Sequence, residues 1–117
     1  MDTKGKAWRE SPGGRSWRAK YRASRRDKIR IQQKANWLKS NYGISLEAYE
    51  AMAAGQDRRC LICGKRRPLV VDHNHRTGGV RGLLCHRCNS GLGFYEDSPD
   101  LCLSAAQYLK ERNDGNY

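Results

Sequence analysis

Two Cys-x-x-Cys pairs enclose the part of the chain whose residue types could carry out chemistry. The pairs are Cys60/Cys63 and Cys85/Cys88. Two thiolate pairs at this spacing are typical of a tetrahedral Zn²⁺ site, because each short turn presents two sulfurs to one point while the intervening segment folds back. Four unrelated buried thiols are the alternative, which the paired spacing in so short a chain disfavours. The sequence therefore predicts a structural zinc site formed by all four cysteines.

Several side chains in and just after the intervening segment suit hydrolysis of a phosphodiester. Asp72, His73 and His75 lie between the pairs, and Asn89 directly follows the last cysteine. Carboxylate and amide oxygens are ligands that Mg²⁺ accepts, together with phosphate oxygens and waters. An imidazole changes protonation near neutral pH and can take a proton from an attacking water. Without further support, however, an acid and an imidazole at a strand end more often form a satisfied polar pair.

The elements that would hold these residues follow from the hydrophobic pattern. Residues 69–71 and 80–84 are β-favouring runs separated by the turn-rich segment 76–79, which predicts a β-hairpin with Asp72 at the end of its first strand. A short helix over residues 45–54 leads into the first cysteine pair, and a short helical segment after Cys88 carries Asn89.

A last helix is predicted from Ser98, because Pro99 stands at its first position. We expect it to bury one of two sets of residues spaced along one face: Leu101, Ala105 and Tyr108, or Cys102, Ala106 and Leu109.

The net charge of +11 is concentrated at one end of the 117-residue chain. Residues 1–41 hold thirteen Lys or Arg against three acids, and residues 42–117 hold ten against nine. Such a concentration of cations is typical of nucleic-acid binding, although a solvated helix face is the alternative. Residues 1–23 read as a flexible basic arm, and an amphipathic helix is predicted from Ser24 to Tyr42. Its candidate phosphate contacts are Arg25, Arg26, Lys28, Arg30 and Lys34.

The stretch from about residue 42 to residue 110 resembles the recombination endonuclease VII family of HNH nucleases. The matching segments are Tyr42–Leu46, Cys60–Gly64, Val71–His75 and Val80–Asn89. The resemblance implies a zinc-stapled ββα-metal core, also called a His-Me finger, and a DNA-cutting activity, directed in the best-known case at branched structures such as Holliday junctions. It also implies a bacteriophage setting.

Residue by residue, the resemblance implies that Asp72 and Asn89 bind a catalytic divalent cation, usually Mg²⁺, and that His73 is the general base. His75 is a secondary candidate for orienting phosphate or touching the metal, and Arg81 and Arg87 are candidate DNA contacts. Some members carry an acid three positions after the metal-binding Asn, where this chain has Leu92. Either Glu96 or Asp97 replaces that acid, or the site works with fewer protein ligands.

Together these observations predict an α+β protein: a small zinc-stapled ββα-metal core with flanking helices and a basic N-terminal helical arm. We expect residues 1–41 to form the arm and amphipathic helix, residues 42–112 the nuclease domain and residues 113–117 a tail. The expected function is metal-dependent DNA cleavage, with Zn²⁺ and Mg²⁺ as cofactors. A nicking or homing-type HNH nuclease and a non-catalytic zinc DNA-binding module are the alternatives.

The expected partners are DNA and, because symmetric junction cleavage needs paired cuts, a second copy of the chain. No apolar stretch resembles a signal peptide or a membrane span, and five cysteines are an odd number for a disulfide framework. We therefore expect reduced thiols, no membrane contact and a cytoplasmic location, in the host cell if the gene is carried by a phage.

Overall fold

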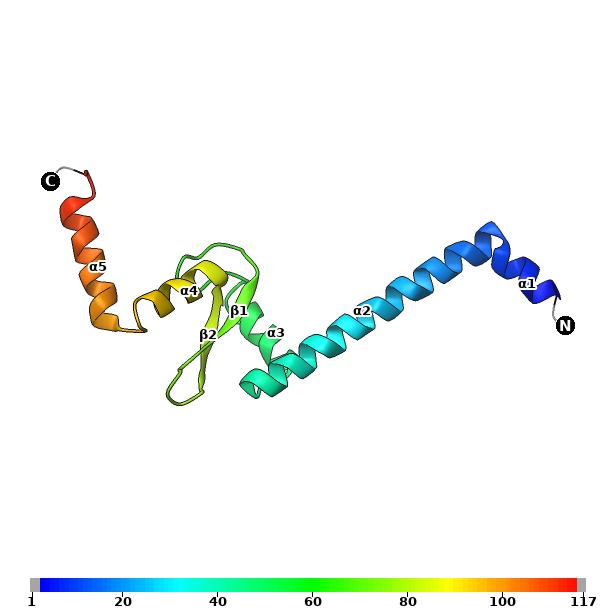
Figure 1. Ribbon diagram of the computed structural model, residues 1–117, viewed down its shortest axis with the longest axis horizontal. Coiled ribbons are helices and arrows are strands. Elements are labelled where there is room, and N and C mark those ends of the chain that lie inside the picture. The colour runs from blue at the N-terminus through cyan, green and yellow to red at the C-terminus, as the bar shows by residue number, and fades with distance from the viewer. Residues whose placement is uncertain (1–2, 116–117) are drawn as a thin grey trace. The chain divides into compact units, whose positions relative to one another are not determined.

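The computed structural model describes residues 3–115 and contains five helices and one two-stranded antiparallel sheet in that range (Figure 1). The predicted α+β class is confirmed. The chain divides between Leu46 and Glu47 into two compact units. The tail predicted over residues 113–117 lies partly outside the described residues.

The N-terminal unit consists of α1 (Thr3–Glu10) and α2 (Pro12–Tyr42). Ser11 caps α2 by accepting a hydrogen bond from the Gly14 N–H group, and Pro12 occupies the first turn, where its missing N–H costs nothing. Gly43 ends α2 with φ +68°, and its N–H group donates to the Lys39 carbonyl. The prediction of a flexible arm up to residue 23 is therefore wrong, because helix α2 already begins at Pro12.

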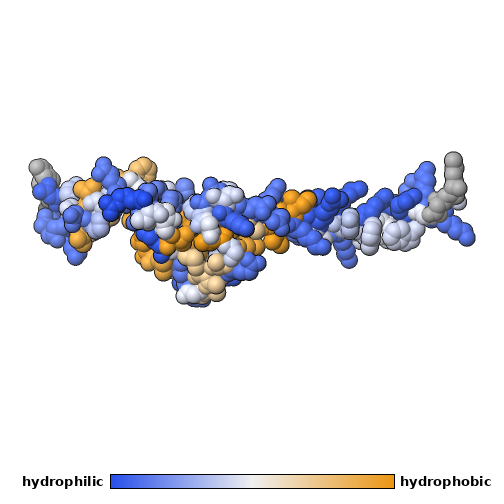
Figure 2. All heavy atoms as spheres, turned by 90° about the horizontal axis from the view of Figure 1, so that it is seen from below, coloured by the Kyte–Doolittle hydropathy of each residue, from blue (hydrophilic) through white to orange (hydrophobic). Residues whose placement is uncertain are grey.

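This unit carries almost no apolar core of its own. Among its described residues only Gly14 and Leu38 are buried, and hydrophilic residues cover most of α1 and α2 in Figure 2. Trp37 packs edge-on against Tyr42, with ring centroids 5.3 Å apart.

The second unit contains the predicted hairpin and the helices around it. Its elements are α3 (Leu46–Gly55), β1 (Leu69–His73), β2 (Val80–Cys85), α4 (His86–Phe94) and α5 (Pro99–Arg112). The strands pair from Leu69 opposite Cys85 to His73 opposite Val80, and α4 packs against both. The predicted order of helix, hairpin, short helix and final helix is confirmed.

Helix α3 is fastened to the hairpin by two side chains. The Tyr49 hydroxyl donates to the Leu69 carbonyl over 2.8 Å. The amide of Gln56, just after α3, accepts from the Leu83 N–H group and donates to the Leu83 carbonyl, at 3.0 and 2.9 Å. Gln56 thus pairs with β2 as a neighbouring strand would. Leu83 is completely buried, and Val71, its partner across the hairpin, and Leu84 are also buried.

Helix α5 differs from the prediction. Ser98 caps it as predicted, accepting from the Leu101 N–H group, and Pro99 is at its first position. None of its residues is buried, so the predicted burial of one apolar face is wrong for the single chain. Leu103 is 69% exposed and Tyr108 is 60% exposed.

Candidate metal and active site

The four cysteines come together as predicted. Cys60 and Cys63 lie in the loop after α3, Cys85 is the last residue of β2 and Cys88 lies in the first turn of α4. All four sulfur atoms lie within 4.8 Å of one another, and Cys102 is not among them. The Cys63 and Cys85 sulfurs are 3.8 Å apart.

This geometry suits a tetrahedral ion. Zn–S bonds of about 2.3 Å place tetrahedral sulfurs about 3.8 Å apart. Burial opposes ionisation of Cys60, but backbone hydrogen bonds from Cys85, Cys63 and Ile62 outweigh it and lower its pKa to about 6. Burial and the neighbouring thiols raise the pKa of Cys88 to about 12. The cluster therefore sheds one proton readily, and a bound Zn²⁺ would supply the attraction that removes the others.

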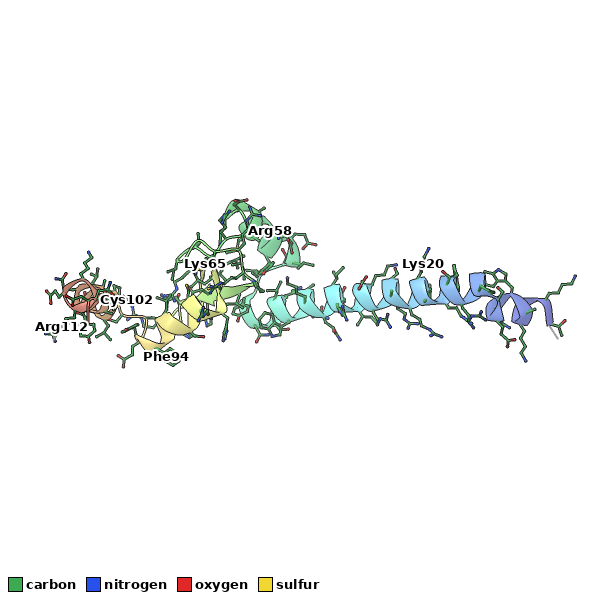
Figure 3. All side chains as sticks on the ribbon, turned by 90° about the horizontal axis from the view of Figure 1, so that it is seen from above. Lys20, Arg58, Lys65, Phe94, Cys102 and Arg112 are labelled. Carbon is green, nitrogen blue, oxygen red and sulfur yellow. The ribbon has the colours of Figure 1, made fainter. Side chains whose placement is uncertain are left out.

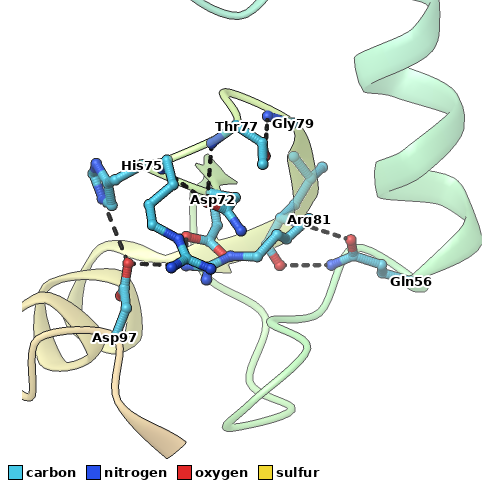
Figure 4. Close-up of polar contacts among 10 residues, drawn as sticks. Gln56, Asp72, His75, Thr77, Gly79, Arg81 and Asp97 are labelled. Atoms are coloured by element: carbon cyan, nitrogen blue, oxygen red, sulfur yellow. Dashed lines mark hydrogen bonds and ion pairs between the residues drawn. The ribbon is translucent and has the colours of Figure 1, made fainter.

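Asp72 is the buried acid of the second unit, 7% exposed, and it lies near the loop end of β1. Both of its oxygens accept hydrogen bonds from Arg81, from Nε at 2.8 Å and from Nη2 at 2.9 Å (Figure 4). The hydrogen bonds to Asp72 raise the pKa of the Arg81 guanidinium, with burial opposing and Asp97 adding to the rise. A buried carboxylate is thus neutralised by a bidentate ion pair.

Arg81 reaches Asp72 because the hairpin is irregular at this point. Asp72 pairs with Gly82 and His73 pairs with Val80, which leaves Arg81 as an extra residue on β2. Such a β-bulge breaks the alternation of side chains and redirects the extra residue. Arg81, predicted as a DNA contact, is thus turned toward the acid.

Asp97 joins the same group of charges from the other side. Its Oδ2 atom lies 3.5 Å from Nη2 of Arg81 and 3.7 Å from Nε2 of His75. Asp97 and the preceding Glu96 both have positive φ, at 51° and 57°, a conformation that non-glycine residues adopt at a cost. The turn between α4 and α5 therefore holds the Asp97 carboxylate beside Arg81.

Asp97 and the surrounding residues enclose a cavity of about 350 Å³. Its walls are formed by Asn74, His75, Arg76, Arg81, Glu96 and Asp97. The cavity opens beside the loop of the hairpin and is lined by charged and polar groups. It is the polar pocket next to the Asp72–Arg81 pair.

The two predicted histidines are neighbours. The ring centroids of His73 and His75 are 4.5 Å apart, although His75 lies past the end of β1. Asn74 explains this: its side-chain oxygen accepts from the Arg76 and Thr77 N–H groups, and Gly78, with φ +75°, donates to its carbonyl. Asn74 therefore forms the turn, and the two imidazoles flank it.

The remaining predicted residues lie on helices α2 and α4. Asn89 is half-buried on α4, which packs against the strand that carries Asp72. Leu92 packs against the cluster of Cys60, Leu84 and Cys85, so the position at which the resemblance led us to look for an acid belongs to the apolar core here. The predicted DNA contacts other than Arg81 are all exposed, on α2 or α4: Arg25, Arg26, Lys28, Arg30, Lys34 and Arg87.

Two partners of the site were missed at the sequence level. Asp97 was considered as a metal ligand but not as a partner of Arg81 and His75, and Gln56 was not considered. No signal in the sequence marks Gln56. Its role arises from where α3 ends relative to β2.

A hairpin and a following helix joined by four clustered cysteines, with an acid and two imidazoles at the loop end, define a small ββα protein whose cysteine cluster could hold a metal ion. The family model described as recombination endonuclease VII matches residues 35–111. Since this is more than half of the chain, the protein belongs to the recombination endonuclease VII family, and the predicted resemblance is confirmed.

Two phage proteins are similar to this chain. It is 46% identical over 77 residues to the Gene 59 protein of Mycobacterium phage D29, covering 62% of this chain and 47% of the relative. It is 43% identical over 75 residues to the Gene 59 protein of Mycobacterium phage L5, covering 60% of this chain and 46% of the relative. The alignments thus span about half the length of these curated relatives. No solved structure matches the chain.

Within residues 3–115, no helix combines the length and the apolar character needed to cross a bilayer.

Proposed function

We propose that this protein is a metal-dependent DNA endonuclease that hydrolyses phosphodiester bonds, in branched DNA above all. The observation that carries the proposal is that one end of a cysteine-stapled hairpin carries a buried carboxylate, Asp72, and two neighbouring imidazoles, His73 and His75, in a chain of the endonuclease VII family. A protein that only binds DNA does not need a buried acid and two imidazoles at one end of a hairpin.

In the proposed site Asp72 and Asn89 hold a divalent cation, with Mg²⁺ the expected ion. Their carboxylate and amide oxygens are the hard ligands that this ion prefers, and α4 packs against β1, which places both residues on contacting elements. When bound, the cation stabilises charge on the phosphate and on the leaving oxygen. We propose Asp97 as the further acid, since it shares the Arg81 guanidinium with Asp72.

We propose that His73 removes the proton from the attacking water through an imidazole nitrogen. His75, whose ring lies against that of His73 and whose Nε2 faces Asp97, is proposed to orient the phosphate. Arg81 is proposed to hold the Asp72 carboxylate in place through its two hydrogen bonds, and to contact the phosphate when Asp72 binds the cation. This extends the sequence-based role of Arg81 as a DNA contact.

DNA affinity is proposed to come from the cations of α2 and from Arg87. The residues on α2 are exposed and spaced along one helix, which suits neutralisation of successive phosphates without reading sequence. Binding should therefore weaken steeply with added salt. The four cysteines are proposed to hold structural Zn²⁺, and the reduced thiols suit the cytoplasm, of an infected host cell if the gene is carried by a phage.

The test compares wild-type protein with His73→Ala and Asp72→Asn on supercoiled plasmid and on a four-way DNA junction, with and without Mg²⁺. Loss of the base should lower the cleavage rate by at least about 100-fold while zinc content and DNA affinity stay near the wild-type values. Cleavage by His73→Ala at the wild-type rate would remove His73 from its role.

The two alternative functions predict different results in the same assay. A nicking or homing-type nuclease would cut linear duplex as well as it cuts a junction. A zinc-dependent binding module would bind both DNA substrates but cut neither of them, whichever divalent cation is added. That result would refute the proposed activity.

A second copy of the chain is proposed as a partner through α5. Symmetric resolution of a junction needs two active sites, and α5 presents apolar side chains that the single chain leaves exposed.

A further inference from the structure

Three aromatic rings form a ladder at the corner between α1 and α2. The Trp17 and Tyr21 rings are stacked, with centroids 5.4 Å apart and an interplanar angle of 12°, and Trp8 lies at 5.9 Å from Trp17 at a tilt of 56°. Trp8 is 53% exposed and the other two rings are each 54% exposed. The ladder lies outside residues 35–111, which the family model matches.

The corner holds the rings in place without a ligand. Ser11 donates from its hydroxyl to the Trp8 carbonyl and caps α2 through the Gly14 N–H group. Gly14 is buried where the two helices approach: a Cβ atom there would lie 2.1 Å from the Trp8 carbonyl oxygen and 2.8 Å from the Arg9 Cα atom. Only glycine allows this approach, so the backbone itself brings Trp8 against Trp17.

The surroundings of the ladder are strongly cationic. Residues 3–26 hold nine Lys or Arg and one acid, Glu10. Arg25 and Lys28 continue the line of Trp17 and Tyr21 along α2 at spacings of three and four residues, which places all four on one side of the helix. Lys20 extends outward from α2 in Figure 3. The half-exposed rings of Trp17 and Tyr21 are thus followed along α2 by cationic side chains that could contact phosphate.

We propose that the Trp8–Trp17–Tyr21 ladder is a stacking site for unpaired bases of single-stranded DNA, with the neighbouring cations neutralising the adjoining phosphates. Aromatic faces bind any base by stacking, and alanine substitution typically costs about 1–3 kcal/mol per base. Duplex DNA hides its base faces, so it engages the cations alone. The ladder therefore gives the protein a preference for DNA with unpaired bases, such as an opened branch point.

A purely structural role for the three rings does not account for their exposure. Rings that served only to fasten the corner would be covered by it, whereas each of these three leaves about half of its surface to solvent. The proposal also goes beyond the proposed function, because it concerns binding by a unit that carries no residue of the hairpin site.

The test measures tryptophan fluorescence of the full-length, zinc-loaded protein without added divalent cation. Trp37→Phe is used as the background, so that Trp8 and Trp17 supply the signal. A short oligothymidylate should quench the fluorescence saturably and bind more tightly than a duplex of equal length. Trp17→Ala should weaken oligothymidylate binding at least about fivefold and duplex binding less than twofold. Trp17→Phe, which restores an aromatic face, should recover most of the loss.

Two controls separate stacking from charge and from folding. Lys20→Ala should weaken both DNA forms by the same factor and lower the salt dependence of binding. Gly14→Ala should open the corner and displace Trp8 while leaving the Trp17–Tyr21 pair within α2, giving a partial loss of single-strand preference with unchanged helical circular dichroism.

The proposal is overturned if oligothymidylate binds no more tightly than duplex, or if Trp17→Ala weakens both forms equally. These outcomes are distinct from failure of the proposed function, because cleavage of plasmid or junction DNA is measured separately. Cutting without single-strand preference would refute only the ladder, and single-strand preference without cutting would refute only the nuclease.

Discussion

At the scale of single residues, the site is organised around one buried carboxylate and its countercharge. Asp72 is held by two hydrogen bonds from Arg81, and the same guanidinium faces Asp97. A guanidinium between two acids supplies the positive charge that a divalent cation would otherwise supply. Arg81 and a cation at Asp72 are therefore expected to compete for the same oxygens.

Arg81→Gln tests this competition. The substitution leaves Asp72 buried without its countercharge, which should lower the free energy of unfolding by about 1–3 kcal/mol in the absence of divalent cations. Added Mg²⁺ or Mn²⁺ should stabilise the variant more than it stabilises the wild type, because the cation no longer displaces a guanidinium. Urea unfolding with and without the cation measures both effects.

The matched control is Arg76→Gln, which removes a guanidinium from the wall of the same cavity but not the one paired with Asp72. It should change neither the stability nor the response to cation by more than about 0.5 kcal/mol. Equal responses of Arg81→Gln and Arg76→Gln would contradict the competition.

The sequence indicated candidate residues for this site but not their partners. The four cysteines could be chosen because their spacing is restricted by metal chemistry, and Asp72 and His73 because the resemblance to the endonuclease VII family implies roles for these positions. The ion pair between Asp72 and Arg81 could not be predicted, because it depends on a β-bulge that shifts the alternation of side chains along β2 by one residue. Regular alternation gives no sign of such a shift.

At the scale of elements, the hairpin is held from outside by the end of α3. The amide of Gln56 makes two hydrogen bonds to the backbone of Leu83, as a paired strand would, and its Nε2 atom also donates to the Arg59 carbonyl. A two-stranded sheet by itself is marginally stable, so these bonds and the Tyr49 contact support the strand that leads into Cys85.

Gln56→Ala should lower the free energy of unfolding by about 1–3 kcal/mol, since the N–H group of the fully buried Leu83 loses its partner. Chemical denaturation of the zinc-loaded protein gives this value. Gln107→Ala on α5, which breaks only an exposed contact with Glu111, should stay within about 0.5 kcal/mol of wild type. A Gln56 variant as stable as the Gln107 variant would show that the amide bonds contribute nothing.

The N-terminal ends of α2 and α5 show why one helix start was predicted from the sequence and the other was not. Ser98-Pro99 and Ser11-Pro12 are the same start signal, and both serve as cap and first turn in the structure. The first was recognised, whereas Gly13 and Gly14 after Pro12 disfavour a helix and argued for a flexible arm. Gly14 is needed for the close approach of α1, which is a tertiary requirement that propensity cannot express.

At the scale of the whole molecule, the hairpin unit buries few apolar side chains and depends on the cysteine cluster. The cluster joins the loop after α3, the end of β2 and the start of α4. Leu84 and Leu92 belong to the same packed group as Cys60 and Cys85, so the ion proposed there would also organise the small apolar core.

Removal of zinc should therefore unfold this unit. Cys85→Ala, or a strong chelator added to the wild type, should abolish the cooperative thermal transition of the unit, because binding free energy at a structural zinc site contributes directly to folding. Cys102→Ala is the matched control, since it removes a thiol outside the cluster. Bound zinc is measured by atomic absorption, and a zinc-free Cys85 variant that kept its transition would refute the structural role.

Helix α5 makes the prediction that belongs to the assembled protein. A hollow of about 400 Å³ is formed by Tyr95, Leu101, Ser104, Ala105, Tyr108 and Leu109. If two copies associate through this face, Leu109→Asp should yield monomers, because it places like charges together in an apolar interface. Gln107→Asp adds the same charge outside the hollow and should keep the wild-type mass in sedimentation experiments.

The consequence for activity follows from symmetry. A monomeric Leu109→Asp protein should still nick plasmid, since all residues proposed for the hairpin site come from one chain, but should lose the paired incisions that resolve a four-way junction. A wild-type protein that is monomeric at every concentration, yet cuts both strands symmetrically, would exclude α5 as the interface and would require the two cuts to come from successive encounters.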